Sequence, residues 1–490
     1  MAGASASSDE LASRQLALLL APPTDDDVAA YYASLLAPGR PGHGDVLVKP
    51  SSKYQGRGLF AARDFAQGER VLCEPPLVGI QQEHNREDAT VCAQCFRYVG
   101  SIERQIATRL LRDSHRKACE GVVERRVLEE LAQGTRTLPN SSHFPLPECF
   151  ECHGGCDRNS YCSDACASNA WSRHERHLCV GPCGVSGRGL AATAFVNHAK
   201  ETNDIFPLAA RVLLETAYAA ENKRNNRVRL AASGTSGAPS AGTPHSSEIE
   251  PAMNPDDDAH DDADQCLVDA WRPYAVAHKG VWWETVAKPA DVPDGAGEDE
   301  FRASMRDIAA ESLNLLRATL ALSDANVLDR YPGLFTIEVY AVVIGMFELN
   351  NLEVAVASPV EDYFLAADET FPEDSPERLV TDPLLDALDV RYCVPCEGTG
   401  FFALQSQLNS DCDPNVTPLK DDGDVDGSCV LVAKRAVKKG EELTMCYVDE
   451  DADVRERRAE LADYGFECAC ERCERESAGL GQARRGGKTK

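Results

Sequence analysis

Three cysteines near the C-terminus have the residue type and spacing of a metal site. Cys468, Cys470 and Cys473 form a C-x-C-x2-C group, so the chain itself brings three thiolates within reach of one ion. Such a group can occupy three corners of a tetrahedral zinc site, with each sulfur about 2.3 Å from the metal. The alternative is three free thiols, but cysteines between charged residues would be open to oxidation. We therefore predict a zinc site whose fourth ligand comes from elsewhere in the chain.

A second group of candidate ligands lies in the first half of the chain. It consists of eight residues: Cys92, Cys95, Cys152, Cys156, Cys162, Cys166, His174 and Cys179. Eight ligands suffice for two closed, four-coordinate structural sites without an open position for a catalytic water. The predicted arrangement is interleaved, with one ion on Cys92, Cys95, Cys162 and Cys166 and the other on Cys152, Cys156, His174 and Cys179. His177 competes with His174 for its place, and Cys149 competes with Cys152.

The composition limits the partners that this chain can have. Among 490 residues, 50 Lys and Arg stand against 79 Asp and Glu, which gives a net charge of −29. Such a protein suits a basic partner, whereas phosphate neutralisation on DNA needs a clustered basic surface. The zinc block also lacks the ββα spacing of DNA-reading fingers, so we expect no direct sequence-specific DNA binding. The apolar run Leu16 to Ala21 is far shorter than the ~20 residues of a membrane span, and we expect no membrane segment.

The elements that position these residues follow from hydrophobic periodicity. Residues 9–36 predict two short helices, and helical spacing returns at Ile102 to Leu111, Ala191 to Ala220, Phe301 to Leu322 and Asp453 to Tyr464. Short β-like runs at Gly58 to Ala62, Glu69 to Glu74 and Leu77 to Ile80 indicate hairpins, and Phe401 to Tyr447 alternates short strands with loops. The Gly/Ser/Pro-rich and then acidic stretch Ser233 to Gln265 is too poor in large apolar residues to order itself.

Two nested patterns in this chain resemble known modules. The inner pattern, Tyr161-Cys162-x3-Cys166-x4-Trp171-x2-His174 followed by Cys179, resembles a MYND-type zinc module. The outer pattern resembles a SET domain, and its pieces are Gly56 to Phe60, Leu408 to Asn415, Gly440 to Tyr447 and Tyr464 to Phe466. Their order is similar to that of the SET-and-MYND methyltransferases, and most similar to a plant trithorax-related branch of histone-lysine methyltransferases.

The resemblance implies a mixed α+β fold. A mainly-β SET fold is interrupted by a MYND-type zinc module and a helical insertion, and is followed by a C-terminal post-SET zinc cluster. The expected segments are an N-terminal helical segment (1–44), the SET N-terminal part (45–90), the MYND-type module with an insertion (91–183), a helical insertion (184–330) with a disordered linker (233–265), the SET C-terminal part (331–450), the post-SET zinc segment (451–475) and a disordered basic tail (476–490).

The resemblance also implies roles for individual residues. Tyr447 would be the catalytic tyrosine, Tyr464 would line the lysine channel, and Cys412 would complete the post-SET zinc site. The S-adenosylmethionine pocket would consist of Gly56, Arg57, Gly58, Ser406, Leu408, Asn409, Ser410 and Phe466. The chain departs from the family at Ser410 and Asp411, where His and Ser are usual, and at Gly345, where many relatives have Asn. Taken singly, each aromatic residue is more often part of a plain core, so the assignment rests on the motif positions.

The implied activity is S-adenosylmethionine-dependent methylation of protein lysines, with a histone tail such as that of histone H3 as substrate. We expect three zinc ions, a nuclear location with the cytoplasm as a second one, a role in chromatin and transcription, and a peptide or protein partner at the MYND-type module. The alternative is a zinc-braced interaction scaffold in a chromatin complex, in which the SET fold has lost catalysis.

Overall fold

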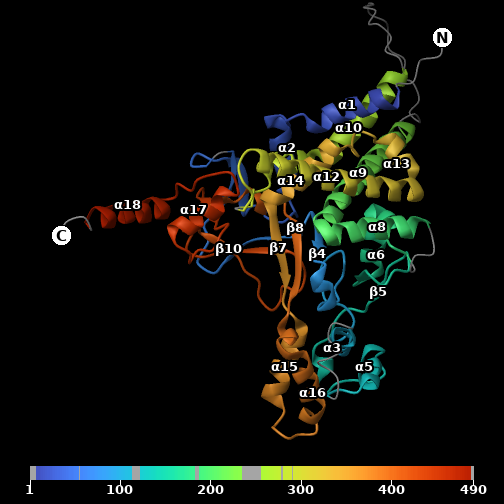
Figure 1. Ribbon diagram of the computed structural model, residues 1–490, viewed down its shortest axis with the longest axis vertical. Helices are drawn as coiled ribbons and strands as arrows, with labels where there is room; N and C mark the ends of the chain where they lie inside the picture. Colours follow the sequence, from blue (N-terminus) through green and yellow to red (C-terminus); the bar gives the residue numbers. More distant parts are fainter. Residues whose placement is uncertain are drawn as a thin grey trace, which may run out of the picture.

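A computed structural model of the protein describes residues 7–54, 56–112, 122–181, 187–233, 255–277, 280–289 and 291–486. It contains both helices and small sheets, as the sequence predicts (Figure 1). In this described part of the chain, no helix combines the length and the apolar character that a bilayer crossing requires.

The sheets are small and most combine distant parts of the chain. The strands are β1 (Val46–Pro50), β2 (Arg57–Ala61), β3 (Arg70–Glu74), β4 (Val78–Gln81), β5 (Phe150–Glu151), β6 (Ser160–Tyr161), β7 (Asn351–Val356), β8 (Cys396–Phe401), β9 (Asn409–Ser410), β10 (Val416–Pro418), β11 (Cys429–Ala433) and β12 (Glu442–Met445). They form sheets in the orders β1-β2-β12-β9, β10-β11-β3, β4-β8-β7 and β5-β6.

The predicted strands are present, but of β2, β3 and β4 only β2 pairs with a strand next to it in the chain, β1. These two pair antiparallel, with Val46 opposite Ala61. In contrast, β3 pairs with β11 and β4 pairs with β8, strands that come more than 300 residues later. A continuous core explains the difference, because Leu59 and Leu72 pack in one buried cluster with Leu431 and Leu443. The two parts of the predicted SET domain thus form one folding unit.

Helices build a thick layer beside these sheets. The helices of the N-terminal and middle segments are α1 (Ser8–Leu20), α2 (Asp25–Leu35), α8 (Gly187–Thr202), α9 (Phe206–Ser233), α10 (Pro255–Ala275), α11 (Trp282–Thr285), α12 (Ala296–Ser323), α13 (Ala325–Arg330) and α14 (Ile337–Asn350). The predicted helical stretch Ala191 to Ala220 is divided between α8 and α9. The largest buried cluster of the described residues lies here, and Phe206, Trp271 and Tyr340 are among its members.

A separate helical lobe extends below the sheets (Figure 1). It consists of α3 (Ile102–Leu111), α5 (Arg125–Ala132), α15 (Pro359–Thr370) and α16 (Arg378–Leu388). Its core joins Ile106 and Leu131 of the zinc-block insertion to Tyr363 and Leu384 of the predicted SET C-terminal part. The long insertion between Cys95 and Cys152 is therefore packed against an insertion from the other half of the chain, which the sequence analysis did not predict.

Two segments expected to be disordered are partly helical. Residues 234–254 of the predicted linker lie outside the described part, but α10 begins at Pro255. Packing explains the helix, because Trp271 is buried and its indole N–H donates to the Leu19 carbonyl at 2.8 Å. At the C-terminus, α17 (Val454–Ala462) is followed by α18 (Glu471–Gly486), so most of the predicted tail is helical and residues 487–490 lie outside the description.

Candidate active site and metal centres

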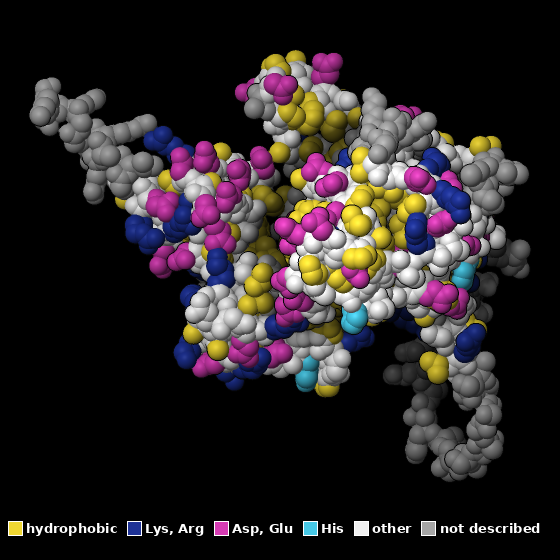
Figure 2. Space-filling view, turned by 90° about the horizontal axis from the view of Figure 1, so that it is seen from below, with side chains coloured by type: hydrophobic (Ala, Val, Ile, Leu, Met, Phe, Trp, Pro, Cys, Tyr) yellow, Lys and Arg dark blue, Asp and Glu magenta, His cyan; other side chains and the backbone are white. Residues whose placement is uncertain are grey.

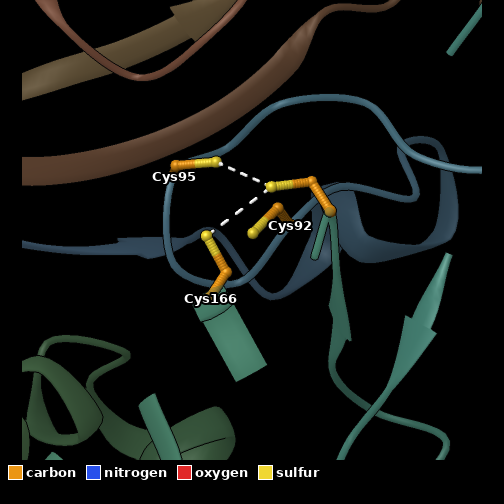
Figure 3. A group of neighbouring side chains, drawn as sticks. Cys92, Cys95 and Cys166 are labelled. Atoms are coloured by element: carbon orange, nitrogen blue, oxygen red, sulfur yellow. Dashed lines mark hydrogen bonds between the residues drawn. The ribbon is translucent and has the colours of Figure 1, made fainter. Parts of the chain in front are cut away.

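Four cysteines of the first half of the chain converge as the interleaved prediction expects. The ligand atoms of Cys92, Cys95, Cys162 and Cys166 all lie within 4.8 Å of one another. Figure 3 shows Cys92, Cys95 and Cys166 of this group gathered at one point. The Cys162 sulfur is 3.6 Å from those of Cys95 and Cys166. Sulfurs bound tetrahedrally at about 2.3 Å from zinc would be about 3.8 Å apart, so the group has the dimensions of a zinc site. A hydrogen bond from Cys95 lowers the pKa of the Cys92 thiol, which favours the thiolate that a metal requires.

A second group forms between the SET core and the C-terminal segment. Cys412, Cys468, Cys470 and Cys473 are all buried, and their sulfurs lie within 4.8 Å of one another. The Cys412 sulfur is 3.8 Å from that of Cys468 and 3.5 Å from that of Cys473. The structure thus brings Cys412 to the terminal cluster, as the resemblance implies. A metal at this point would tie α18 to the core.

The third group differs from the prediction in one ligand. Cys152, Cys156 and Cys179 converge with Glu175, again within 4.8 Å, and His174 is not part of the group. His174 instead lies with its Nδ1 3.1 Å from Oε1 of Glu215 in α9. The segment Trp171–Glu175 that carries both residues forms a π-helical turn.

The two competitors considered for this group also lie outside it. His177 Nδ1 is 3.0 Å from the Ser323 hydroxyl in α12, and Cys149 is not among the converging ligands.

A cavity of about 350 Å³ opens beside the predicted tyrosines. Tyr447 and Tyr464 both line this cavity, and their ring centroids are 5.2 Å apart. Phe466 packs edge-on to Tyr447 with a centroid distance of 6.5 Å. Tyr464 and Phe466 remain 36% and 37% exposed, so the aromatic wall faces solvent on one side. Apolar aromatic walls are the surroundings that lower the pKa of an entering amine.

A parallel strand pair positions the backbone around Tyr447. Strands β12 and β9 pair in parallel, with Met445 opposite Ser410, and this places Tyr447 beside the end of the Leu408 segment. The Tyr447 hydroxyl donates a hydrogen bond to the Leu408 carbonyl at 2.5 Å. Burial raises the pKa of Tyr447 to about 12, so its hydroxyl is protonated near neutral pH. Tyr447 is therefore a fixed hydrogen-bond donor at the cavity wall.

The glycine turn before β2 is held against the same segment. Gly56 has a φ of +82°, and a Cβ at Gly58 would lie 2.3 Å from Oε1 of Glu442. The Asn409 side chain donates to the Arg57 carbonyl at 3.0 Å and to Glu442 at 2.8 Å. Glycine is needed at both positions, once for the backbone conformation and once for the close approach. The predicted pocket residues Gly56, Arg57, Gly58, Leu408 and Asn409 thus adjoin one another.

The residues that depart from the family pattern are accommodated. Asp411 Oδ2 accepts hydrogen bonds from Lys53 Nζ and from the Tyr54 hydroxyl, both at 2.7 Å. Burial acts to raise the pKa of Asp411, but these bonds outweigh it and lower the pKa. The Ser410 hydroxyl is buried and has no hydrogen-bond partner in the described part of the chain. Asp411 therefore holds the loop before the glycine turn next to Cys412, its neighbour in sequence.

Two further residues support this site. Gly345, which the sequence marks as a departure from the family pattern, lies where helix α14 meets α11, and a Cβ there would be 2.6 Å from the Gly280 carbonyl. Glu74 is buried and accepts hydrogen bonds from the amides of Leu404 and Gln405, at the turn that carries Ser406. No sequence signal marked Glu74, although a carboxylate at the end of an apolar strand is a feature to examine.

Comparisons with known proteins identify this architecture. The profile of the SET domain matches residues 253–448. Histone-lysine N-methyltransferase ATXR2 of Arabidopsis thaliana is 35% identical over 507 residues, which cover 96% of this chain and 98% of that protein. Mouse histone-lysine N-methyltransferase SMYD3 is 42% identical over 79 residues, and Yarrowia lipolytica histone-lysine N-methyltransferase SET5 is 43% identical over 76. These two shorter matches each cover 17% of the relative's length.

The chain therefore belongs to the SET-domain family of protein-lysine methyltransferases. Within that family its similarity extends over nearly its whole length to the plant protein ATXR2. Membership implies S-adenosylmethionine as the methyl donor, and the cysteine groups provide sites that could hold zinc.

Proposed function

We propose that this protein methylates lysine residues of histone tails, including that of histone H3, with Tyr447 as the catalytic residue. The observation that carries this proposal is the cavity at Tyr447. Besides Tyr447 and Tyr464 it is lined by three carboxylates, Glu348, Glu460 and Asp463, and no Lys or Arg is among the lining residues. A basic segment around a target lysine is the complement of this acidic rim. The relatives ATXR2, SMYD3 and SET5 are named as histone-lysine methyltransferases, which agrees with such a substrate.

Acidic side chains also line a second cavity. Glu348 also lines a neighbouring cavity of about 520 Å³, together with Asp204 and Glu353. Glu348 accepts a hydrogen bond from the Trp282 indole at 2.7 Å, and burial raises its pKa. The described residues include no Lys or Arg that forms a salt bridge with Asp204 or Glu353. The two cavities together offer room and charge for basic residues on either side of a target lysine.

The mechanism assigns defined tasks to the residues at Tyr447. The bound donor supplies an electrophilic methyl group for in-line transfer to the lysine amine. The Tyr464 ring and the apolar face of Tyr447 desolvate the amine and so favour its neutral, nucleophilic form. The Tyr447 hydroxyl and the Leu408 carbonyl, already joined by a hydrogen bond, form a polar pair fixed before the substrate enters. Tyr464 lines the channel and restricts the path of the side chain.

The donor pocket is proposed at the glycine turn. Gly56 has a positive φ and open space where a Cβ would be, which lets a ligand approach the backbone. The buried, unpartnered hydroxyl of Ser410 is a free hydrogen-bonding group beside it. The full proposed set is Gly56, Arg57, Gly58, Ser406, Leu408, Asn409, Ser410 and Phe466.

We further propose three structural zinc ions, one for each group of converging ligands. The protein would act in the nucleus on chromatin and transcription, with a peptide or protein partner at the MYND-type module. On the face seen in Figure 2, Lys and Arg occur as separate small groups among acidic and apolar side chains. This distribution agrees with a protein that does not bind specific DNA sequences directly.

The experiment that tests the substrate proposal changes the acidic rim. Glu460→Gln with Asp463→Asn removes two exposed charges at the cavity, while Glu369→Gln with Glu373→Gln removes two exposed charges from the distant α15 region as a matched control. Exposed charges contribute about 0.2–1 kcal/mol each, so for two charges we expect kcat/KM for histone peptides to fall about two- to thirtyfold at low salt and less at high salt.

The control variant should keep wild-type values in the same assay. Equal effects of the two variants would contradict the role of the rim. A wild-type protein that binds S-adenosylmethionine but methylates no histone would refute the histone proposal and favour the scaffold.

A further inference from the structure

The group Cys152, Cys156, Glu175 and Cys179 contains a carboxylate where an imidazole was predicted. Glu175 is only 3% exposed. A buried ionised carboxylate is costly unless a cation compensates it. Within the described residues no Lys, Arg or His forms a salt bridge with Glu175. Its Oε1 accepts a hydrogen bond from the Asn159 side chain at 2.6 Å, and this neutral amide brings no positive charge to the carboxylate. The unpaired carboxylate therefore points to a cation among the three sulfurs.

The backbone explains why Glu175, and not His174, reaches the cysteines. The Cys179 amide donates to the Glu175 carbonyl at 2.8 Å, so the two residues are one helical turn apart and lie on the same face. His174 is five residues before Cys179 and projects from a different face of the same turn. The π-helical segment Trp171–Glu175 ends where this α-helical turn begins, so the α-helical spacing from Glu175 to Cys179 decides which residue shares the face of Cys179.

Two of the three sulfurs accept hydrogen bonds from backbone amides. Those of Cys152 and Cys179 are 3.7 Å apart, close to the separation expected in a tetrahedral zinc site. The Cys152 sulfur accepts a hydrogen bond from the Gly154 amide at 3.4 Å, and the Cys179 sulfur accepts one from the Gly181 amide at 3.3 Å. Amide donors of this kind support ligands around a metal.

His174 has a separate partner. Its ring is 2% exposed and contacts Glu215 of α9, and Arg173 forms an ion pair with the same carboxylate. Adjacent residues of one turn therefore serve two purposes, with Glu175 directed to the cysteines and Arg173 and His174 directed to α9.

We propose that Glu175 is the fourth zinc ligand of this group, which makes it a Cys3Glu site, and that His174 positions the zinc module on α9 through Glu215. The site has three thiolates and one carboxylate, so its total charge with zinc is more negative by one unit than that of a Cys3His site. Ligation and docking are coupled, because the ligand and the docking residues occupy consecutive positions.

Zinc content of two isosteric variants tests the assignment. Glu175→Gln should release one of three zinc ions at least tenfold faster to a weak chelator, since even changes around a ligand cost 10- to 100-fold in metal affinity. His174→Gln should retain three ions but show faster hydrogen exchange in the α9 segment that faces the module. Cys156→Ser is the positive control for loss of the same ion. Native mass spectrometry and metal analysis give the counts.

Three results would overturn the proposal. The first is that His174→Gln releases zinc and Glu175→Gln retains it, the second is that both variants release zinc at the same rate, and the third is that the wild-type protein binds fewer than three zinc ions. If Glu175→Gln fails to fold, the wild-type protein decides. With ¹¹³Cd in place of zinc and ¹⁵N-labelled histidine, we expect no ¹⁵N–¹¹³Cd coupling, and coupling to the His174 ring would refute the assignment.

Discussion

Replacing Tyr447 by Phe separates a catalytic role from a structural one. The change removes a single hydroxyl, which donates to the Leu408 carbonyl, and retains the ring that packs against Tyr464 and Phe466. The aromatic wall of the cavity should therefore keep its shape. Any large loss of activity must then come from the hydroxyl.

The two roles differ in the size of the expected effect. Loss of one buried hydrogen bond should lower the free energy of unfolding by about 1 kcal/mol. Typical proteins have a stability of about 5–15 kcal/mol, so the folded fraction would hardly change. Removal of one preorganised donor from a reaction site costs about 10²–10³ in turnover, or about 2.7–4 kcal/mol. A hundredfold loss of turnover in folded protein therefore cannot result from the loss of stability alone.

The assay measures turnover on a histone substrate, S-adenosylmethionine affinity and melting temperature on the same preparations. Tyr363→Phe is the matched control, because the Tyr363 hydroxyl also donates to a backbone carbonyl, that of Pro139 at 2.9 Å, but lies in the helical lobe. We expect similar losses of stability in both variants and a large loss of turnover only in Tyr447→Phe. Near-normal turnover of Tyr447→Phe would refute Tyr447 as the catalytic residue.

The remaining predictions concern the supports of the site. Cys412→Ser should release one zinc ion and speed hydrogen exchange in residues 464–473, since Cys412 shares a ligand group with the terminal cysteines; unchanged zinc content and exchange would remove Cys412 from that group. Burial raises the pKa of Glu74 from 4.5 to about 7, so the stability linked to its proton is present below pH 4.5 and is lost as pH rises through 7. The stability of Glu74→Gln relative to wild type should therefore increase between pH 4.5 and about 7 in urea unfolding, and a constant difference over this range would contradict the shifted pKa.

Local patterns allowed the sequence to predict several features directly. The helices α1, α2 and α3 lie where apolar periodicity and capping residues place them, and Thr24 caps α2 through the Asp27 amide. The three terminal cysteines are close in the chain, so their convergence needed no knowledge of the fold. These features depend on interactions within one or two turns of the chain, which residue type and spacing specify.

Long-range features were decided by tertiary packing. The pairing of β3 with β11, and the shared core of α3 and α15, join residues hundreds of positions apart through burial of apolar surface, which no local spacing encodes. The position of Cys412 beside the terminal cysteines came from family resemblance alone before the structure showed it. His174 and Glu175 are neighbours in sequence, and local spacing did not reveal that Glu175 converges with the cysteines while His174 lies beside the Glu215 carboxylate on α9.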